Sequence, residues 1–137
     1  MQAQAEQDTL FRTAERYLSH YPDWCEALKH LTGQRASSVS DAIVPRRYRM
    51  GRPTEAIAIR RYMLHVLIAR VEECLARLTP REHEFVRRYY WRKKDRMNLY
   101  VVADEMNLHR HTASQMRRSV VQMMMAVLQG DGDDVSA

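Results

Sequence analysis

Residues 98–118 read "NLYVVADEMNLHRHTASQMRR", and this stretch decides the fold. Its hydrophobic side chains recur at helical spacing on both sides of the three residues "NLH". Asn98 is suited to cap a helix, and Asn107 can adopt the left-handed backbone conformation that ends one. Two small residues, Ala103 and Ala113, flank the turn and allow close packing. The stretch therefore predicts two closely packed helices joined by a short turn.

The predicted pair of helices, over 99–106 and 110–128, has the form of a helix-turn-helix, whose second helix enters the major groove of DNA. We expect Ala113, Met116 and Val120 to face the interior, which makes the opposite face of the second helix polar. Glutamine, arginine and serine side chains can all bond to base edges in the major groove. The residues expected to contact bases are Arg110, His111, Ser114, Gln115 and Arg118.

The segment around this motif is strongly basic. Residues 79–118 carry ten Lys and Arg side chains against five Asp and Glu, and many of these cations lie in the loop "WRKKDRM" at 91–97. Cations beside a helix-turn-helix commonly bind backbone phosphates and fix the register of the protein on the duplex. The alternative is a solvated loop without a ligand. The residues expected to contact phosphate are Arg92, Lys93, Lys94, Arg96 and Arg117.

Further helices are predicted upstream. The sequence "TPRE" at 79–82 has the form of a capping box with proline at the first helical position, and it should start a helix that ends near Tyr90. A longer helix is expected over 54–78. The N-terminal residues 10–31 also show helical spacing, and Pro22 within them would kink or break the helix. The fold class is therefore all-α.

Each long helix has a predicted inward-facing seam. The seams are Leu10, Ala14, Tyr17, Tyr21, Trp24, Leu28 and Leu31 in the first helix, Leu64, Leu67, Val71, Cys74 and Leu78 in the middle helix, and Ala113, Met116, Val120, Met123 and Val127 in the last.

The chain is expected to contain four segments. Residues 1–31 form an N-terminal helical arm for assembly or partner contact, and residues 32–53 form a basic surface linker. Residues 54–129 form the helical DNA-binding domain, with the helix-turn-helix at 98–128. The polar and acidic residues 130–137 form a disordered tail.

The end of the linker, 45–53, has two interpretations. Its Gly-Arg-Pro sequence is similar to hooks that lie in an A·T-rich minor groove. Met50 stands where such a hook needs arginine, which favours a basic linker without that role.

The composition favours a helical protein with an acidic partner. The chain has 137 residues with only four Gly and four Pro, a net charge of +5 and a pI of about 9.5. Cys25 and Cys74 are far apart and form no C-x-x-C pattern, which fits a reducing cytoplasm. We find no run of about 18 apolar residues and no export signal. We therefore expect a cytoplasmic location, with association to the nucleoid of a bacterial host, and no membrane contact.

No arrangement in the sequence points to catalysis, a metal or a cofactor. His109 and His111 are two residues apart on or beside a predicted helix, so their side chains diverge and cannot share a metal ion. Glu82, His83 and Glu84 are consecutive and diverge in the same way. The sequence contains neither a nucleophile elbow nor a phosphate-binding glycine loop. We therefore expect no enzymatic activity and no bound cofactor.

Residues 78–128 resemble region 4 of bacterial sigma factors. The matching residues are Leu78, Thr79 and Glu82 at the Leu-Thr-x-x-Glu start, Val102, Ala103, Met106 and Leu108 in the hydrophobic skeleton, and Gln115 at the place of a base-contacting glutamine. Asn107 replaces the usual Gly and His109 the usual Ser cap. The rest of the chain departs from sigma factors, because it contains no region 2.

The order of segments is similar to that of the ArpU and RinA type of phage late-gene transcriptional regulators. This resemblance implies sequence-specific binding to duplex DNA near a late promoter, and contact with the host RNA polymerase is a further expectation. The alternatives are a small terminase subunit for DNA packaging and an RNA polymerase-binding module that does not contact bases. A homo-oligomer, with a dimer favoured, is expected through the N-terminal or middle helix.

Overall fold

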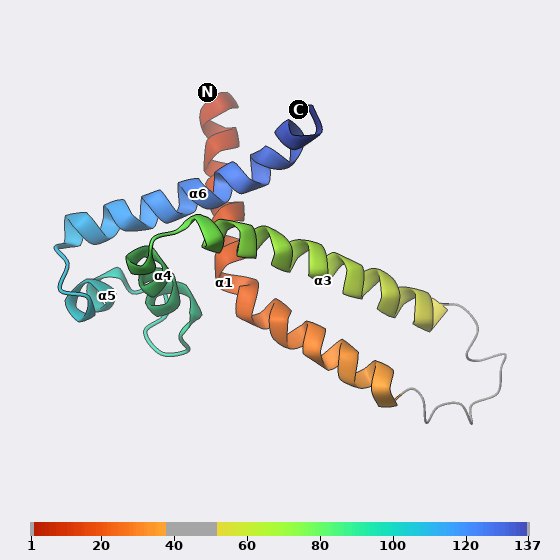
Figure 1. Cartoon of the computed structure of the whole chain (residues 1–137). Helices are drawn as coiled ribbons and strands as arrows, with labels where there is room; N and C mark the ends of the chain where they lie inside the picture. The colour runs from red at the N-terminus through yellow and green to blue at the C-terminus, as the bar shows by residue number, and fades with distance from the viewer. Residues whose placement is uncertain (1, 38–51, 137) are drawn as a thin grey trace.

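The structure is a computed structural model that describes residues 2–37 and 52–136, and all regular structure in these two ranges is helical (Figure 1). The elements are α1 (Gln2–Ser37), α3 (Arg52–Arg77), α4 (Pro80–Val86), the π-helix η2 (Arg87–Trp91), α5 (Leu99–Glu105) and α6 (Arg110–Ser136). The prediction of an all-α fold is therefore confirmed for the described residues.

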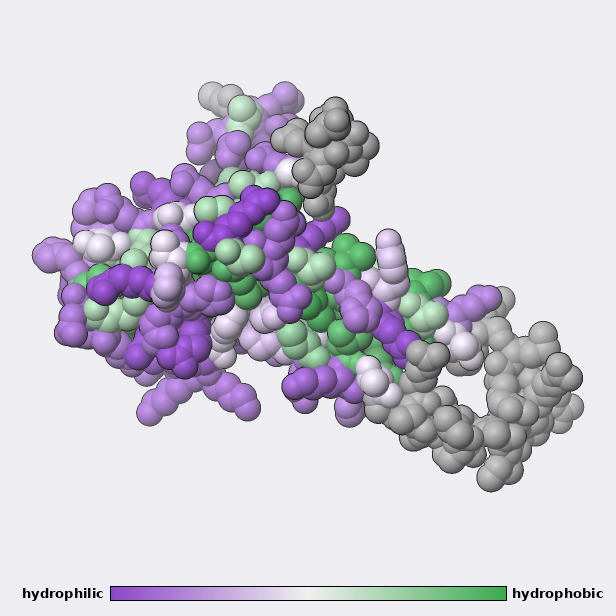
Figure 2. Space-filling view, viewed as in Figure 1, coloured by the Kyte–Doolittle hydropathy of each residue, from purple (hydrophilic) through white to green (hydrophobic). Residues whose placement is uncertain are grey.

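The helices form two connected parts (Figure 1). In one part, the second half of α1 and the first half of α3 run side by side in opposite directions and extend away from the rest of the molecule. In the other part, α4, η2 and α5 lie together on one side of α6, and the N-terminal half of α1 crosses α6 near the middle of α6. Figure 2 shows mostly hydrophilic residues over the second part and a concentration of hydrophobic residues along the paired helices α1 and α3.

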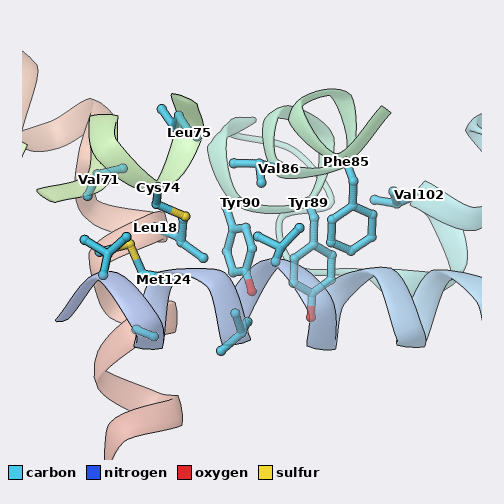
Figure 3. Packing of buried hydrophobic residues seen from close by; sticks show 14 residues of the cluster. Leu18, Val71, Cys74, Leu75, Phe85, Val86, Tyr89, Tyr90, Val102 and Met124 are labelled. Atoms are coloured by element: carbon cyan, nitrogen blue, oxygen red, sulfur yellow. The ribbon is translucent and has the colours of Figure 1, made fainter. Parts of the chain in front are cut away.

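One main core joins all these helices. Figure 3 shows how side chains from α3, α4 and η2 converge on α6, with the rings of Tyr89 and Tyr90 pointing from η2 toward it. The buried residues of this core are Ala14 and Leu18 from α1, Val71, Cys74 and Leu75 from α3, Phe85 and Val86 from α4, Tyr89 and Tyr90 from η2, Val102 from α5, and Val120, Val121, Met124 and Val127 from α6. A smaller cluster of Leu31, Leu64 and Ile68 holds the two-helix extension together.

The N-terminal segment, expected to form an arm for assembly or partner contact, also packs into the main core. Ala14 and Leu18 of α1 are both 0% exposed, so residues 1–31 contribute to the same core as the C-terminal helices. Helical spacing in the sequence shows that α1 has an apolar face, but it does not show which helices cover that face. Leu18 was also missed from the predicted seam, although it is one of the largest fully buried side chains.

The other two seams are confirmed in part, because Leu64, Val71 and Cys74 of α3 and Ala113, Val120 and Val127 of α6 are buried. In α3 the buried side chains include Ile68 and Leu75, whereas the predicted Leu67 and Leu78 are only partly buried. In α6 they include Val121 and Met124, whereas the predicted Met116 and Met123 are partly buried. Both helices pack against more than one neighbour, so their buried stripes are wider than a single seam.

The helix ends also differ from the prediction. The predicted linker loses residues 32–37 to α1 and residues 52–53 to α3, and the rest of it lies outside the described residues. The expected disordered tail, 130–137, is also corrected, because α6 continues to Ser136. The extensions of α1 and α6 contain no proline, and Pro53 lies in the first turn of α3, where proline is tolerated. A glycine disfavours a formed helix by only about 1 kcal/mol.

Pro22 bends α1 without breaking it. It also leaves a backbone carbonyl of α1 free to accept a hydrogen bond from another element. The helix is continuous across Pro22, and Figure 1 shows that its two halves run in different directions. Proline has no backbone N–H, so the carbonyl oxygen of Leu18, one turn earlier, loses its helical donor. The indole Nε1–H of Trp91 donates to this oxygen at 2.8 Å. The proline thus leaves a free acceptor on α1, and Trp91 at the end of η2 donates to it.

We predict that the Trp91 hydrogen bond is coupled to Pro22. Trp91→Phe should destabilise the protein by about 1 kcal/mol, because it leaves the Leu18 carbonyl without a donor. In a Pro22→Ala background the restored backbone N–H at position 22 can bond to that carbonyl, so the same change should have a clearly smaller effect. Urea unfolding of the four proteins gives the coupling free energy. An equal loss in both backgrounds would contradict this account.

The two cysteines should differ in reactivity. Cys74 is 0% exposed in the main core, and burial raises the pKa of its thiol to about 12. Cys25 on α1 is partly exposed. At pH 8, a thiol reagent such as a disulfide dye should modify one cysteine of the native protein quickly and the second only after unfolding in urea. Rapid modification of both thiols in the native protein would show that the core around Cys74 opens.

Candidate nucleic-acid interface

The sequence-predicted start of α4 is present in full. Thr79 Oγ1 accepts a hydrogen bond from the backbone N–H of Glu82 at 3.2 Å, and the Glu82 carboxylate accepts one from the backbone N–H of Thr79 at 2.9 Å. The second carboxylate oxygen of Glu82 accepts from the hydroxyl of Ser119 on α6 at 3.1 Å. The capping box is therefore confirmed, and Glu82 also connects the start of α4 to α6.

The segment from Asn98 to α6 has the local geometry that the sequence predicts. The side chain of Asn98 accepts from the backbone N–H of Val101 at 3.3 Å and caps α5. Asn107 has a φ of 56°, so the left-handed residue after α5 is where it was expected. The backbone N–H of Leu108 then donates to the carbonyl of Ala103 at 2.8 Å, which closes the turn.

The two small residues on either side of this turn are both buried. Ala103 of α5 is 2% exposed and Ala113 of α6 is 0% exposed. A larger side chain at either position would need space that the contact between α5 and α6 does not provide. The close packing that the sequence requires at this turn is therefore present.

The start of α6 exposes polar side chains on the side away from Ala113. Arg110, His111 and Gln115 are exposed and Ser114 is partly exposed. Among the described residues, no hydrogen bond or ion pair uses the side chains of His111, Ser114 or Gln115. The first two turns of α6 thus present donors and acceptors that are available to a ligand.

Arg110 has a neighbour that sequence reasoning missed. Its guanidinium lies 4.3 Å from the centre of the Tyr100 ring, and the ring itself is 60% exposed. Tyr100 is in the first turn of α5, so this cation–π contact places an aromatic hydroxyl beside the first residue of α6. The exposure of Tyr100 could have been predicted from the sequence, because Val102, Ala103 and Met106 define the inner face of α5 and Tyr100 is not on it.

Arg118 lies one turn beyond Ser114 and Gln115 on α6. It lines an open groove between α1 and α6 together with Gln7, Asp8 and Phe11 of α1 and Gln122 of α6. Asp8 places a carboxylate in the same groove. The N-terminal half of α1 therefore borders the polar face of α6 beyond its second turn, and Arg118 lies at this border.

Three of the five cations expected to contact phosphate are used inside the protein. Arg92 donates to Glu105 at 2.7 Å, and Arg96 donates to the backbone carbonyls of Ser19 at 2.7 Å and Tyr90 at 3.1 Å. Arg117 donates to both carboxylate oxygens of Glu15, at 2.9 and 2.8 Å. In the free protein these guanidinium groups are therefore paired within the fold, and contact of Arg92, Arg96 and Arg117 with phosphate stays a prediction.

Lys93 and Lys94 remain exposed in the loop after η2. The loop is fixed at its far end, because the backbone N–H of Met97 donates to the carbonyl of Tyr89 at 2.7 Å. Two of its residues, Asp95 and Met97, have φ values of 57° and 59°. This conformation is unfavourable for residues other than glycine and is kept only where surrounding contacts hold it. The two lysines therefore extend from an anchored loop.

A partly buried charge cluster fixes α6 relative to α1 and η2. Glu15 of α1 accepts from Arg117 of α6 and also from the hydroxyl of Tyr90 at 2.7 Å. The Glu15 side chain is only 12% exposed. Its hydrogen bonds to Arg117 raise the pKa of that guanidinium, and burial is the main cause that raises the pKa of the Tyr90 hydroxyl.

The acidic residues near η2 are also paired. The pKa of Glu84 is lowered by hydrogen bonds from Arg87 and Arg88, and that of Glu105 by hydrogen bonds from Arg92 and Arg88. Much of the positive charge of residues 79–118 is thus neutralised by neighbours within the fold. The exposed Lys and Arg side chains of residues 79–118 that form no hydrogen bond or ion pair with other described residues are Lys93, Lys94, Arg110 and Arg118.

The described residues hold no obvious metal or membrane site. Within residues 2–37 and 52–136, no group of three or more His, Cys, Asp or Glu side chains is placed to hold a metal ion. Among the helices described, none combines the length and apolar character that a membrane span needs. Comparisons with protein-family models, with curated proteins and with solved structures found no match to this chain.

We predict that the positive φ of residue 107 limits which amino acids this position tolerates. Asn107→Gly should keep or slightly raise the free energy of unfolding, because glycine adopts a positive φ without strain. Asn107→Ala should lower it by about 1 kcal/mol, since the alanine Cβ is unfavourable there. Urea unfolding of the two variants and the wild type measures the difference. Equal stability of the two variants would show that the turn relaxes to another conformation.

Proposed function

We propose that α5, the turn and α6 form a helix-turn-helix with which this protein binds duplex DNA in a sequence-specific way. The observation that carries the proposal is the start of α6, where polar side chains without partners among the described residues stand on a turn held by Asn107 and by the Leu108–Ala103 hydrogen bond. A rigid, polar, exposed helix start is what a major groove accepts.

The proposed contacts divide into two kinds. Gln115, Ser114 and His111 contact base edges, since amide, hydroxyl and imidazole groups can bond to the donors and acceptors of the major groove. Arg110 contacts either a guanine or a phosphate, with Tyr100 fixing its position through their contact at 4.3 Å. Lys93 and Lys94 contact the backbone and provide affinity without sequence preference. Arg118 is placed at the edge of the interface, because α1 borders its groove.

The biological role that we propose is transcriptional regulation of phage or prophage late genes. It rests on the resemblance of residues 78–128 to sigma factor region 4 and of the whole chain to the ArpU and RinA type of regulator. Two local features of that resemblance, the Thr79–Glu82 capping box and the left-handed Asn107, have the geometry that the motif requires. Capping boxes and left-handed helix ends also occur in other helical proteins.

The division of contacts can be tested with four variants. Gln115→Ala should lower affinity for the preferred site by about 1–3 kcal/mol and leave nonspecific binding almost unchanged. Lys93→Ala should weaken binding to all sequences equally and reduce the slope of log affinity against log salt by about one unit. Gln129→Ala, further along α6, and Lys29→Ala, on α1, are matched controls that also remove exposed side chains. Equal effects of Gln115→Ala on every sequence would contradict its role in base contact.

The role itself is tested by genomic selection at about 150 mM salt, where nonspecific binding is weak. The purified protein is mixed with fragmented DNA of its phage or host, and the retained fragments are sequenced. A sharp site upstream of a late operon supports the regulator. A site at a packaging start indicates a terminase subunit instead. Failure to retain any DNA refutes the proposal and favours a polymerase-binding module.

A further inference from the structure

Helix α3 has a second apolar stripe that is not buried by the other helices of the described residues. Ile59, Tyr62 and Met63 are 60%, 69% and 56% exposed, and Val66 continues the stripe as a partly buried residue. At 100° per residue these four side chains lie on one face of the helix, roughly opposite Leu64 and the rest of the buried face. Figure 2 shows hydrophobic residues at the surface of this two-helix extension.

The concentration of these residues is unusual for a monomer surface. Of the five large hydrophobic residues that are exposed in the described parts of the chain, three lie within residues 59–63. The other two, Met97 and Tyr100, are beside the candidate DNA interface. A contiguous exposed apolar patch commonly marks a surface that binds another protein. The stripe therefore needs a partner.

The stripe is self-complementary about its centre, which lies between Tyr62 and Met63. Moving outward by equal steps, the next positions on the same face are Ile59 on one side and Val66 on the other, both β-branched. The outermost positions are Glu55 and Arg70, which carry opposite charges. A face with this symmetry matches a second copy of itself when the two helices run antiparallel.

We propose that this stripe is a homodimer interface in which the α3 helices of two copies pack antiparallel about a two-fold axis at Tyr62 and Met63. Glu55 then faces Arg70 of the partner subunit, and this contact occurs twice. Arg70 already donates to the Tyr17 hydroxyl of its own chain at 3.0 Å, so its guanidinium is held near α1. A parallel arrangement would instead place Glu55 opposite Glu55 and Arg70 opposite Arg70, which is unfavourable.

The expected dimer should dissociate within a concentration range in which its dissociation constant can be measured. Residues 55–70 span about 24 Å of helix, and a contact one helix wide buries less than the roughly 800 Å² per partner of a standard interface. We therefore expect a dissociation constant on the order of micromolar. This inference is independent of DNA binding, and its test uses no DNA. If both proposals hold, two copies of α6 are related by a two-fold axis and the DNA site is an inverted repeat.

The first test is sedimentation of the full chain between about 0.1 and 100 µM, a range chosen to span that affinity. The wild type should shift from monomer to dimer. Tyr62→Glu should weaken the dimer at least about 100-fold, because it places an unpaired carboxylate in the interface. The matched control Ala76→Glu adds the same charge at an exposed position of α3 beyond the stripe and should leave the dimer unchanged. A wild type that stays monomeric, or a Tyr62→Glu protein that dimerises normally, overturns the proposal.

The second test addresses the antiparallel arrangement. Glu55→Arg and Arg70→Glu should each weaken the homodimer roughly tenfold, because each change creates two like-charge contacts. An equimolar mixture of the two variants should dimerise like the wild type, since the charges are then opposite in both contacts. Misfolding of one variant cannot produce this recovery. If the mixture dimerises no better than either variant alone, the antiparallel pairing is wrong.

Discussion

The carboxylate of Glu15 holds together three segments that are far apart in the sequence. It receives two hydrogen bonds from Arg117 of α6 and one from Tyr90 of η2, and its side chain is 12% exposed. A charge in such a position is stable only while its partners remain, because a buried carboxylate without them has lost its hydration. Glu15 therefore fixes the crossing of α1 and α6, together with the packing of Ala14 and Leu18 in the main core. One turn further along α1, the carbonyls of Leu18 and Ser19 bind Trp91 and Arg96, so the same helix also fixes the loop that carries the exposed lysines.

Because of these contacts, several of the positive charges near the candidate interface hold the fold together in the free protein. The count of Lys and Arg in residues 79–118 predicts a broad phosphate-binding surface, but a count does not distinguish cations that face solvent from cations that cross-link helices. Arg117 and Arg96 bind α1, and Arg92 binds Glu105. What remains is a smaller set of exposed cations, in the loop after η2 and in the first turns of α6. In the proposed complex, sequence preference comes from neutral groups such as Gln115, and the structural arginines act indirectly by holding α6 in place.

The local features of the fold could be predicted from the sequence, and the long-range ones could not. The capping box at Thr79, the cap at Asn98 and the left-handed Asn107 each involve groups a few residues apart, so the residue types almost determine the geometry. The Glu15–Arg117 pair joins residues 102 apart, and nothing in either local sequence indicates the other. The same holds for α1 as a whole. Its spacing predicted an apolar helix but not its place in the core, and Pro22 was recognised as a source of a bend but not of a free carbonyl.

The bend at Pro22 connects the two proposed surfaces of the molecule. Before the bend, Glu15 of α1 binds Arg117 of α6, and the hydroxyl of Tyr21 donates to Glu72 of α3 at 3.0 Å. After the bend, α1 packs on α3 through the cluster that contains Leu31. Tyr17 adds a further link, because it accepts a hydrogen bond from Arg70 at the end of the α3 stripe. The angle of α1 is therefore transmitted to α3 by packed side chains and hydrogen bonds. In the proposed dimer, that angle determines how far apart and in which orientation the two α6 helices lie. The spacing of the two halves of a DNA site would then be set by a rigid helix with a single fixed bend, so a change at Pro22 should affect which spacing is preferred even though Pro22 contacts no DNA.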